Sequence, residues 1–108
     1  MTDKQVADMI RSAGLQTAYY QYPVNQVPPL PYTVYYYPNT DNFGADDKVY
    51  TNISVLNIEL YTKDKSPTVE AQLEAVLASN NLFWNKTEAY LDSEKMYEVL
   101  YEMEIING

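Results

Sequence analysis

The stretch that decides the fold is KVYTNISVLNIELYT, residues Lys48 to Thr62. It is the longest continuous strand signal in the chain, because β-branched and aromatic residues favour strands. Its apolar residues occupy odd positions as far as Val55 and even positions from Leu56 onward. This change of phase predicts a bulge or a strongly coiled strand between Val55 and Leu56. At ~3.3 Å per residue the stretch would be about 50 Å long, which also favours a bend or an arm that projects beyond the domain.

A helix is predicted directly after this strand. Ser66 is a preferred N-cap residue, and Pro67 suits the first helical position. The helix is expected to end at Asn80 and Asn81, because asparagine tolerates the left-handed conformation of a C-cap. Its apolar face consists of Val69, Leu73, Val76 and Leu77, and its polar face is expected to carry Glu70, Gln72, Glu74 and Ser79.

Two more strands are predicted in the last third of the chain, from Leu82 to Leu91 and from Lys95 to Ile106. A turn at Asp92-Ser93-Glu94 joins them into a hairpin. In the second strand, Tyr97, Val99, Tyr101, Met103 and Ile105 alternate with Glu98, Leu100, Glu102 and Glu104. This alternation predicts a half-buried strand whose odd positions face the helices. A helix could also be drawn through Met96, Val99, Leu100 and Met103, but Tyr97, Tyr101 and Ile105 would lie off its apolar face, and the preceding turn suits a hairpin, so the strand is preferred.

The N-terminal third begins with a second helix. Thr2-Asp3-Lys4-Gln5 matches a capping box, and Gly14 stands where a left-handed C-terminal cap is needed. Two strands follow, Thr17 to Tyr22 and Tyr32 to Tyr37, joined by a connection with four prolines between Pro23 and Pro31. The whole pattern predicts a single α+β domain over residues 1–108. Its mainly antiparallel sheet of four to five strands is covered on one face by two helices.

Composition argues against most catalytic and nucleic-acid-binding functions. The chain of 108 residues has no cysteine, no histidine and a formal net charge of −8, from 7 basic and 15 acidic residues. Histidine and cysteine are the commonest nucleophilic or metal-binding groups, and an acidic surface repels phosphates. We expect a protein without enzymatic activity, cofactor or metal. The N-terminus lacks an apolar signal-peptide core, and no run approaches the ~18 residues of a membrane span, so a cytoplasmic protein is expected.

Two local motifs favour ordinary connections over binding sites. The aspartates of the loop from Asn39 to Asp47 do not have the spacing of a calcium-binding EF-hand. The segment from Pro28 to Pro31 has the form PxxP, but no basic residue nearby would orient it in a recognition groove. We interpret the first as a polar loop and the second as a rigid connection between strands.

Tyrosine is unusually frequent, with 12 residues in this short chain. Each hydroxyl needs a hydrogen-bond partner, so a dry core cannot hold all of them. Some are therefore expected at the surface, where aromatic residues are typical of protein interfaces. The alternative is that tyrosine fills half-buried strand positions.

The second half of the chain resembles a known family. The resemblance is carried by Glu59-Leu60-Tyr61-Thr62-Lys63 and by AYLDSEKMYEVLYEMEI, residues Ala89 to Ile105. From about Lys48 to Ile106 the chain is similar to the small tail-completion or tail-terminator proteins of siphophages and of prophages of Gram-positive hosts.

The resemblance implies a structural subunit without catalytic residues. Such a protein would form a ring, commonly of six copies, at the head-proximal end of the tail. It would contact the major tail tube protein and a head-completion (neck) protein, and would be assembled in the host cytoplasm into the virion tail or neck. Genome DNA would pass through the ring without specific binding, and no membrane would be involved.

Two groups of residues are candidates for roles in such a ring. Subunit or partner contacts are expected from Phe43, Tyr50, Ile53 and Val55, because the long strand has room to project. The lumen is expected to be lined by Asp41, Asp46 and Asp47, with Glu102 and Glu104 as the second choice, because an anionic wall repels DNA. Two alternative functions are a small acidic phage inhibitor that mimics DNA and a peptide-binding adaptor.

Overall fold

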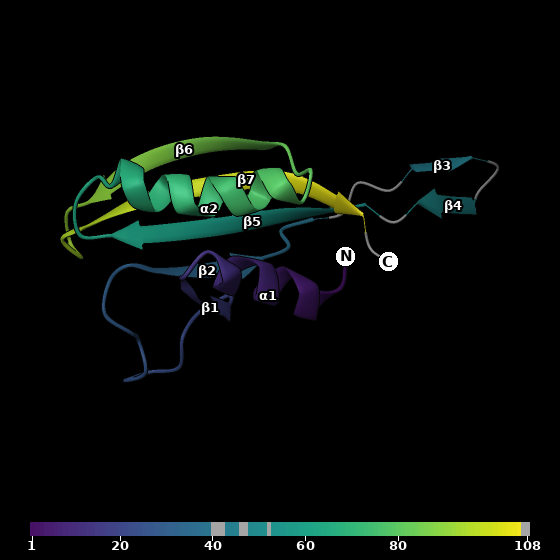
Figure 1. Ribbon diagram of the computed structural model, residues 1–108. Coiled ribbons are helices and arrows are strands. Elements are labelled where there is room, and N and C mark those ends of the chain that lie inside the picture. Colours follow the sequence, from purple (N-terminus) through teal and green to yellow (C-terminus); the bar gives the residue numbers. More distant parts are fainter. Residues whose placement is uncertain (40–42, 46–47, 52, 107–108) are drawn as a thin grey trace.

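The structure, a computed structural model, describes residues 1–39, 43–45, 48–51 and 53–106. Within this part of the chain there are two helices and seven strands (Figure 1). In chain order they are α1 (Asp3–Ser12), β1 (Gln16–Tyr19), β2 (Tyr32–Tyr36), β3 (Phe43–Ala45), β4 (Lys48–Thr51), β5 (Ile53–Thr62), α2 (Pro67–Ser79), β6 (Trp84–Leu91) and β7 (Met96–Ile106).

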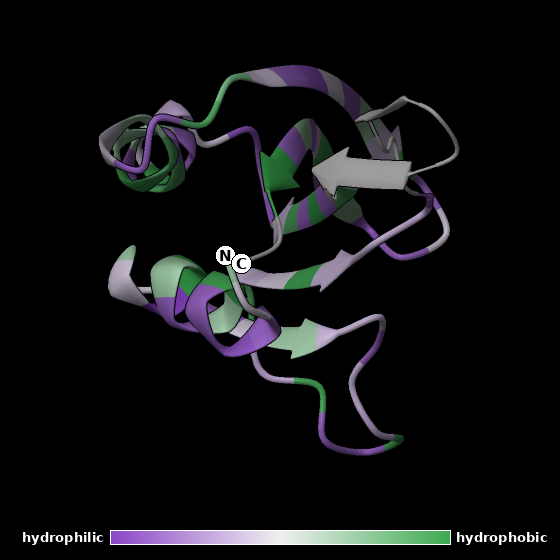
Figure 2. Cartoon of the chain, turned by 90° about the vertical axis from the view of Figure 1, so that its right-hand side faces the viewer, coloured by the Kyte–Doolittle hydropathy of each residue, from purple (hydrophilic) through white to green (hydrophobic). Residues whose placement is uncertain are grey.

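Five of these strands form one sheet in the order β1-β2-β5-β7-β6. β1 and β2 run parallel, and the other neighbours pair antiparallel. Figure 2, which views the sheet end-on, shows both helices on the same side of it. The predicted α+β class, with a mainly antiparallel sheet covered on one face by two helices, is confirmed. No helix in the described residues is long and apolar enough to cross a membrane.

Short sequence motifs determine where α1 begins and ends. The backbone N–H of Gln5 donates to Thr2 Oγ1 (3.2 Å), and the backbone N–H of Thr2 donates to Gln5 Oε1 (2.8 Å). This reciprocal pair is the predicted capping box. Gly14 has φ +85° just beyond the C-cap, a conformation that favours glycine.

The predicted ends of α2 are also confirmed. Ser66 Oγ accepts from the backbone N–H of Val69 (3.3 Å), and Asn81 adopts φ +59° after the last turn. The predicted polar face of this helix is wrong at one position, because Glu70 is only 3% exposed. Glu70 precedes Leu73 by three residues and Leu77 by seven, so it belongs to the inward stripe.

The core lies between the sheet and the two helices. α1 contributes Val6 and Ile10, α2 contributes Leu73 and Leu77, and the strands contribute Leu56, Ile58, Leu60, Val99, Tyr101, Met103 and Ile105. The odd positions of β7 therefore face the helices as predicted, while Glu102 and Glu104 are exposed.

The predicted change of phase between Val55 and Leu56 is wrong. The pairing of β5 with β7 runs without a register shift from Ile53↔Ile106 to Thr62↔Tyr97. Leu56 and the following even positions face the helices throughout β5, and Ile53 and Val55 are half-buried on the opposite face. Apolar residues on both faces at the start of β5 caused the mistaken prediction.

The long stretch from Lys48 to Thr62 is divided into two strands. β4 pairs antiparallel with β3 in a separate two-stranded sheet, and β5 enters the main sheet. Figure 1 shows the β3–β4 hairpin beyond the end of the main sheet, on the side where both chain termini lie. The projecting arm expected from the sequence is therefore this hairpin.

Candidate interaction surface

The sheet has one face that no helix of the described chain covers. We call it the open face. The register places on it the even positions of β2 and β7 and the odd positions of β5 and β6. Val34 and Asn57 on this face are each only 6% exposed. Neighbouring side chains and the connection from β1 to β2 must therefore shield the middle of the open face.

A group of five tyrosines and one glutamate lies on this face, and we call it the tyrosine–Glu59 cluster: Tyr20, Tyr22, Tyr32, Tyr36, Tyr61 and Glu59. Its centre is the Glu59 carboxylate. The Tyr36 hydroxyl donates to Glu59 Oε2 (2.9 Å), and the Tyr61 hydroxyl donates to Glu59 Oε1 (2.5 Å). Hydrogen bonds to a carboxylate are stronger than neutral ones, so these two contacts fix both rings around Glu59.

Ring contacts hold the remaining members in place. Tyr22 and Tyr32 pack edge to face with centroids 5.3 Å apart, and Tyr32 packs against Tyr61 at the same separation. Tyr20 packs edge to face on Tyr36, with centroids 5.7 Å apart. Such pairs contribute about 0.5–1.5 kcal/mol beyond the area they bury. The Tyr22 hydroxyl also donates to the Thr33 carbonyl (3.0 Å), which holds the connection from β1 to β2 against the sheet.

Tyr20 has a backbone conformation unusual for an aromatic residue. Its φ is +69°, in the left-handed region, which costs about 1–2 kcal/mol for a residue with a side chain. The backbone N–H of Tyr20 donates to the Tyr35 carbonyl (2.8 Å), and that of Gln21 donates to the Tyr19 carbonyl (2.8 Å). These bonds hold the chain where it leaves β1. Tyr20 is 66% exposed at the edge of the cluster.

Two small cavities open beside the cluster and share Tyr20 and Glu59. One, of about 240 Å³, is lined by Tyr22, Tyr32, Tyr61 and residues of the connection. The other, of about 230 Å³, is lined by Tyr36. Small-molecule sites usually measure about 300–1,000 Å³. Each cavity is therefore of a size for one side chain rather than for a large cofactor.

The charge on the open face is negative. Glu59, Glu98, Glu102 and Glu104 lie on it, and none of the described strand residues of this face is basic. Burial raises the pKa of Glu98 above its usual value, and the negative charge of Glu59 raises it further, although the Tyr61 hydroxyl opposes both effects. Glu59 and Glu98 therefore repel each other, and no basic side chain among the described residues forms an ion pair with either of them.

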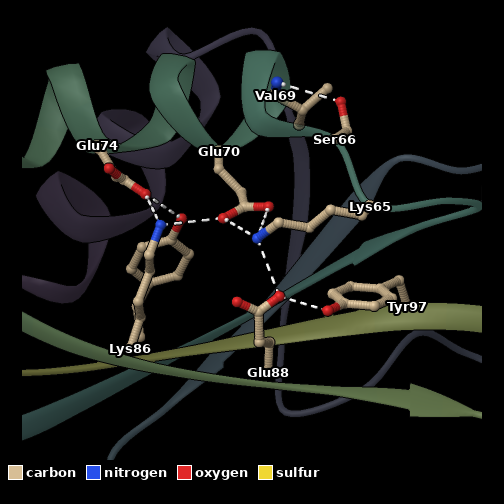
Figure 3. Close-up of polar contacts among 9 residues, drawn as sticks. Lys65, Ser66, Val69, Glu70, Glu74, Lys86, Glu88 and Tyr97 are labelled. Atoms are coloured by element: carbon tan, nitrogen blue, oxygen red, sulfur yellow. Dashed lines mark hydrogen bonds and ion pairs between the residues drawn. The ribbon is translucent and has the colours of Figure 1, made fainter.

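The helix side of the sheet carries a different polar arrangement, the α2 ion cluster of Lys65, Glu70, Glu74, Lys86 and Glu88 (Figure 3). Lys65 Nζ lies 2.7 Å from Glu70 Oε2 and 2.9 Å from Glu88 Oε2. Lys86 Nζ lies 2.7 Å from Glu74 Oε2 and 3.0 Å from Glu70 Oε1. Two cations and three carboxylates thus connect α2 with β6 and with the turn that follows β5.

Two tyrosines of β7 complete this cluster. The Tyr101 hydroxyl donates to Glu74 Oε2 (2.8 Å), and the Tyr97 hydroxyl donates to Glu88. Lys86 Nζ lies 5.9 Å from the Tyr101 ring centroid, and Lys65 Nζ lies 5.7 Å from that of Tyr97, both within cation–π range. The hydrogen bonds that Lys65 donates to the carboxylates of Glu70 and Glu88 raise the pKa of Lys65 well above its ordinary value. The cluster orients α2 on the sheet and leaves each lysine matched by carboxylates.

A third group of tyrosines fastens α1 to the sheet. Tyr35 and Tyr37 both donate to the Asp3 carboxylate, at 3.2 Å and 2.9 Å, and Tyr19 packs against both rings. Burial raises the pKa of Tyr35 to about 12, and the Asp3 carboxylate contributes to the rise. The described tyrosines thus include both surface positions and half-buried strand positions.

The structure places only part of the interface that the sequence predicts. Ile53 and Val55 lie at the start of β5 on the open face, opposite Ile106 and Glu104 of β7. Phe43 begins β3, and Tyr50 lies within β4, so these two belong to the projecting hairpin. The candidate lumen residues Asp41, Asp46 and Asp47 lie outside the described residues.

The tyrosine–Glu59 cluster was not predicted as a site. The alternation in the β2 segment places Tyr32 and Tyr36 on one face of a strand, but only the pairing with β5 brings Glu59 and Tyr61 beside them. No group of three or more potential metal-binding side chains occurs in the portion of the chain that the structure describes.

Comparison with known proteins identifies a fold but no family. No family model matches the sequence, and no curated protein matches it. A chain in the virion of a native gene transfer agent (GTA) particle has a similar structure, with a TM-score of 0.53 and 11% sequence identity. The similarity covers 94% of this chain and 86% of that chain. This chain therefore shares the fold of that virion component over almost its entire length.

Proposed function

We propose that this protein is a non-enzymatic structural subunit of a phage-like virion. The observation that carries the proposal is the fold shared with a chain of the GTA virion over 94% of this sequence. A match of that extent concerns the whole domain rather than one supersecondary motif. The resemblance of residues 48–106 to tail-completion proteins points in the same direction.

The more specific proposal is a tail terminator that joins the tail to the head. Six copies would form a ring at the head-proximal end of the tail, between the major tail tube protein and a head-completion protein. The β3–β4 hairpin supports this proposal, because an arm beyond the main sheet can reach a neighbouring subunit (Figure 1). Phe43 and Tyr50 on the arm, and Ile53 and Val55 at its base, would make the subunit contacts.

Acidic residues would serve the passage of DNA through such a ring. Each residue that faces the lumen is repeated once per subunit, so a single aspartate becomes a ring of negative charge. We propose Asp41, Asp46 and Asp47 for this position, in the segment that holds the arm. Repulsion acts over a Debye length of ~10 Å at 0.1 M salt, so it matters only if the lumen is narrow.

The test is the mass of the assembly, alone and with the tail tube protein of the same phage-like element. Native mass spectrometry and analytical ultracentrifugation should give a closed oligomer, and electron microscopy should show it capping tube ends. Val55→Glu should reduce the fraction of oligomer. The matched control Thr87→Glu, at an exposed site of the open face on the edge strand β6, should not. A protein that stays monomeric in the presence of tubes contradicts the proposal.

A second candidate function is a DNA mimic that inhibits a DNA-binding protein. The observation that favours it is the one-sided charge of the open face, with Glu59, Glu98, Glu102 and Glu104 and no basic strand residue among those described. Such a mimic would displace duplex DNA from purified nucleases as a monomer. The combined change Glu98→Gln, Glu102→Gln and Glu104→Gln should abolish that displacement, whereas ring formation should survive it.

A further inference from the structure

We propose that one of the two cavities at the tyrosine–Glu59 cluster, the one lined by Tyr22, Tyr32 and Tyr61, binds an arginine or lysine side chain of a basic partner protein. The inference goes beyond the virion role, because it concerns the chemistry of a site within a single copy. It would hold for a ring subunit and for a monomer alike.

The helix side of the sheet already contains two tyrosine–glutamate pairs that each bind a lysine. On the helix side, the Glu74 carboxylate accepts from the Tyr101 hydroxyl (2.8 Å) and from Lys86 Nζ (2.7 Å), and Lys86 also lies over the Tyr101 ring. Glu88 accepts from Tyr97 and from Lys65, which lies over the Tyr97 ring. In both cases a tyrosine–glutamate pair holds a cation between the carboxylate and the aromatic face.

The open face repeats this arrangement without the cation. Glu59 accepts from Tyr36 (2.9 Å) and from Tyr61 (2.5 Å), but no basic side chain in the described part of the chain pairs with it. A tyrosine hydroxyl carries no positive charge, so these two hydrogen bonds leave the charge of the carboxylate unbalanced. Glu59 therefore presents a negative charge beside aromatic walls.

The shape of the cavity also suits a cationic side chain. Arginine and lysine bind within about 6 Å of aromatic ring centroids, and several tyrosine rings line this cavity. Its volume of about 240 Å³ is small for a whole ligand of drug size. Tyr20, the most exposed of the four lining tyrosines, is accessible to such a side chain from solvent.

The occupant is expected to come from another protein. Four of the seven basic residues of this chain, Lys4, Arg11, Lys65 and Lys86, already pair with carboxylates of their own subunit. A net charge of −8 also favours a basic partner over an acidic one at this site. The proposed occupant is therefore an exposed arginine or lysine on a basic segment of a partner.

The proposal can be tested with short peptides as probes. Protein with isotope-labelled tyrosine rings would be titrated with Ac-Gly-Arg-Gly-NH₂ and Ac-Gly-Lys-Gly-NH₂ and followed by NMR. The neutral control is the same peptide with citrulline in place of arginine, since citrulline keeps the shape and loses the charge. We expect shifts at Tyr20, Tyr32 and Tyr61, and an affinity for the arginine peptide about tenfold above that for citrulline.

Variants separate this site from general attraction to an acidic protein. Glu59→Gln should remove the preference for the charged peptides, because the amide can still accept from the tyrosines but carries no charge. Tyr20→Asn should weaken binding by removing an aromatic wall. Glu102→Gln removes one exposed charge from the same face, away from the cavity, and should leave binding unchanged.

Three results would overturn the proposal. The first is equal affinity for the arginine and citrulline peptides. The second is undiminished binding by Glu59→Gln. The third is an equal loss of binding with Glu102→Gln, because this would mean that net charge alone attracts the peptides. Failure of ring assembly would not affect this test, since the cavity belongs to one copy.

Discussion

Lys65 Nζ lies 2.7 Å from Glu70 Oε2, and this ion pair places a carboxylate that is only 3% exposed inside the helix–sheet interface. A buried charge is tolerated when it is fully paired, and breaking such a pair costs about 3–5 kcal/mol. Lys86 is the second cation at the same carboxylate. The negative charge of Glu70 is therefore stabilised in the folded protein by Lys65 and Lys86.

The first prediction concerns these two lysines. Replacing both, Lys65→Met with Lys86→Met, should lower the free energy of unfolding by about 3 kcal/mol or more, because Glu70 would stay buried without a cation. Adding Glu70→Leu to this pair should recover most of the loss. Urea unfolding measures both effects. Lys4→Met, which breaks an exposed pair with Asp8, is the control and should leave the free energy of unfolding almost unchanged.

The second prediction is a loss of stability in acid that depends on Glu74. Burial raises the pKa of this carboxyl, but hydrogen bonds from Lys86 and Tyr101 outweigh burial and hold it below the usual value. The folded state therefore binds the proton more weakly than the unfolded state. The contribution of ionised Glu74 to the free energy of unfolding is complete above the pKa of the unfolded state, about 4.3. It is lost as the pH falls through the lower pKa of the folded state. Glu74→Gln should flatten that part of the stability curve; an unchanged acid slope would contradict this.

Glu98 should behave in the opposite way. Burial and the nearby Glu59 raise its pKa in the folded state, so its ionisation destabilises the fold. The penalty is absent in acid and develops as the pH rises from the unfolded value of about 4.3 to the raised folded value. Glu98→Gln should therefore be more stable than the natural protein at pH 7 and equal to it at pH 3. Glu104→Gln is the matched control on the same strand and should have little effect at either pH.

The fourth prediction tests the register of β7. Val99 is 1% exposed and faces the helices, whereas Glu102 is exposed on the other face. Val99→Asp would bury an unpaired charge and remove a side chain whose burial contributes about 1.5–3 kcal/mol, so the variant should show no cooperative unfolding transition. Glu102→Gln should unfold within about 0.5 kcal/mol of the natural protein. Similar stabilities of the two variants would contradict the assigned faces.

Signals that act over a few residues were readable from the sequence. The capping box of Thr2 and Gln5, the left-handed Gly14 and the Ser66-Pro67 start of α2 depend on neighbours along the chain. The alternation in residues 95–106 also predicted the strand and its buried face correctly, since the odd positions from Tyr97 to Ile105 are all apolar or aromatic. These predictions hold because local geometry alone decides them.

Features that depend on distant partners were not readable. Glu70 looks like a surface residue until Lys86, sixteen residues later, is placed beside it. The parallel pairing of β1 with β2 has no local signature, and it decides which tyrosines meet Glu59. The start of β5 is apolar on both faces, so periodicity could not tell which face the helices cover.

The last prediction separates the backbone of Tyr20 from its ring. At φ +69° most side chains are strained, but asparagine adopts this region readily. Tyr20→Asn should therefore be about 1 kcal/mol more stable than Tyr20→Ala in urea unfolding, although both lose the same aromatic contact with Tyr36. Both variants should bind the arginine peptide weakly, because binding depends on the ring. Equal stabilities would mean that the left-handed conformation does not persist in solution, and strong binding by Tyr20→Asn would remove Tyr20 from the proposed site.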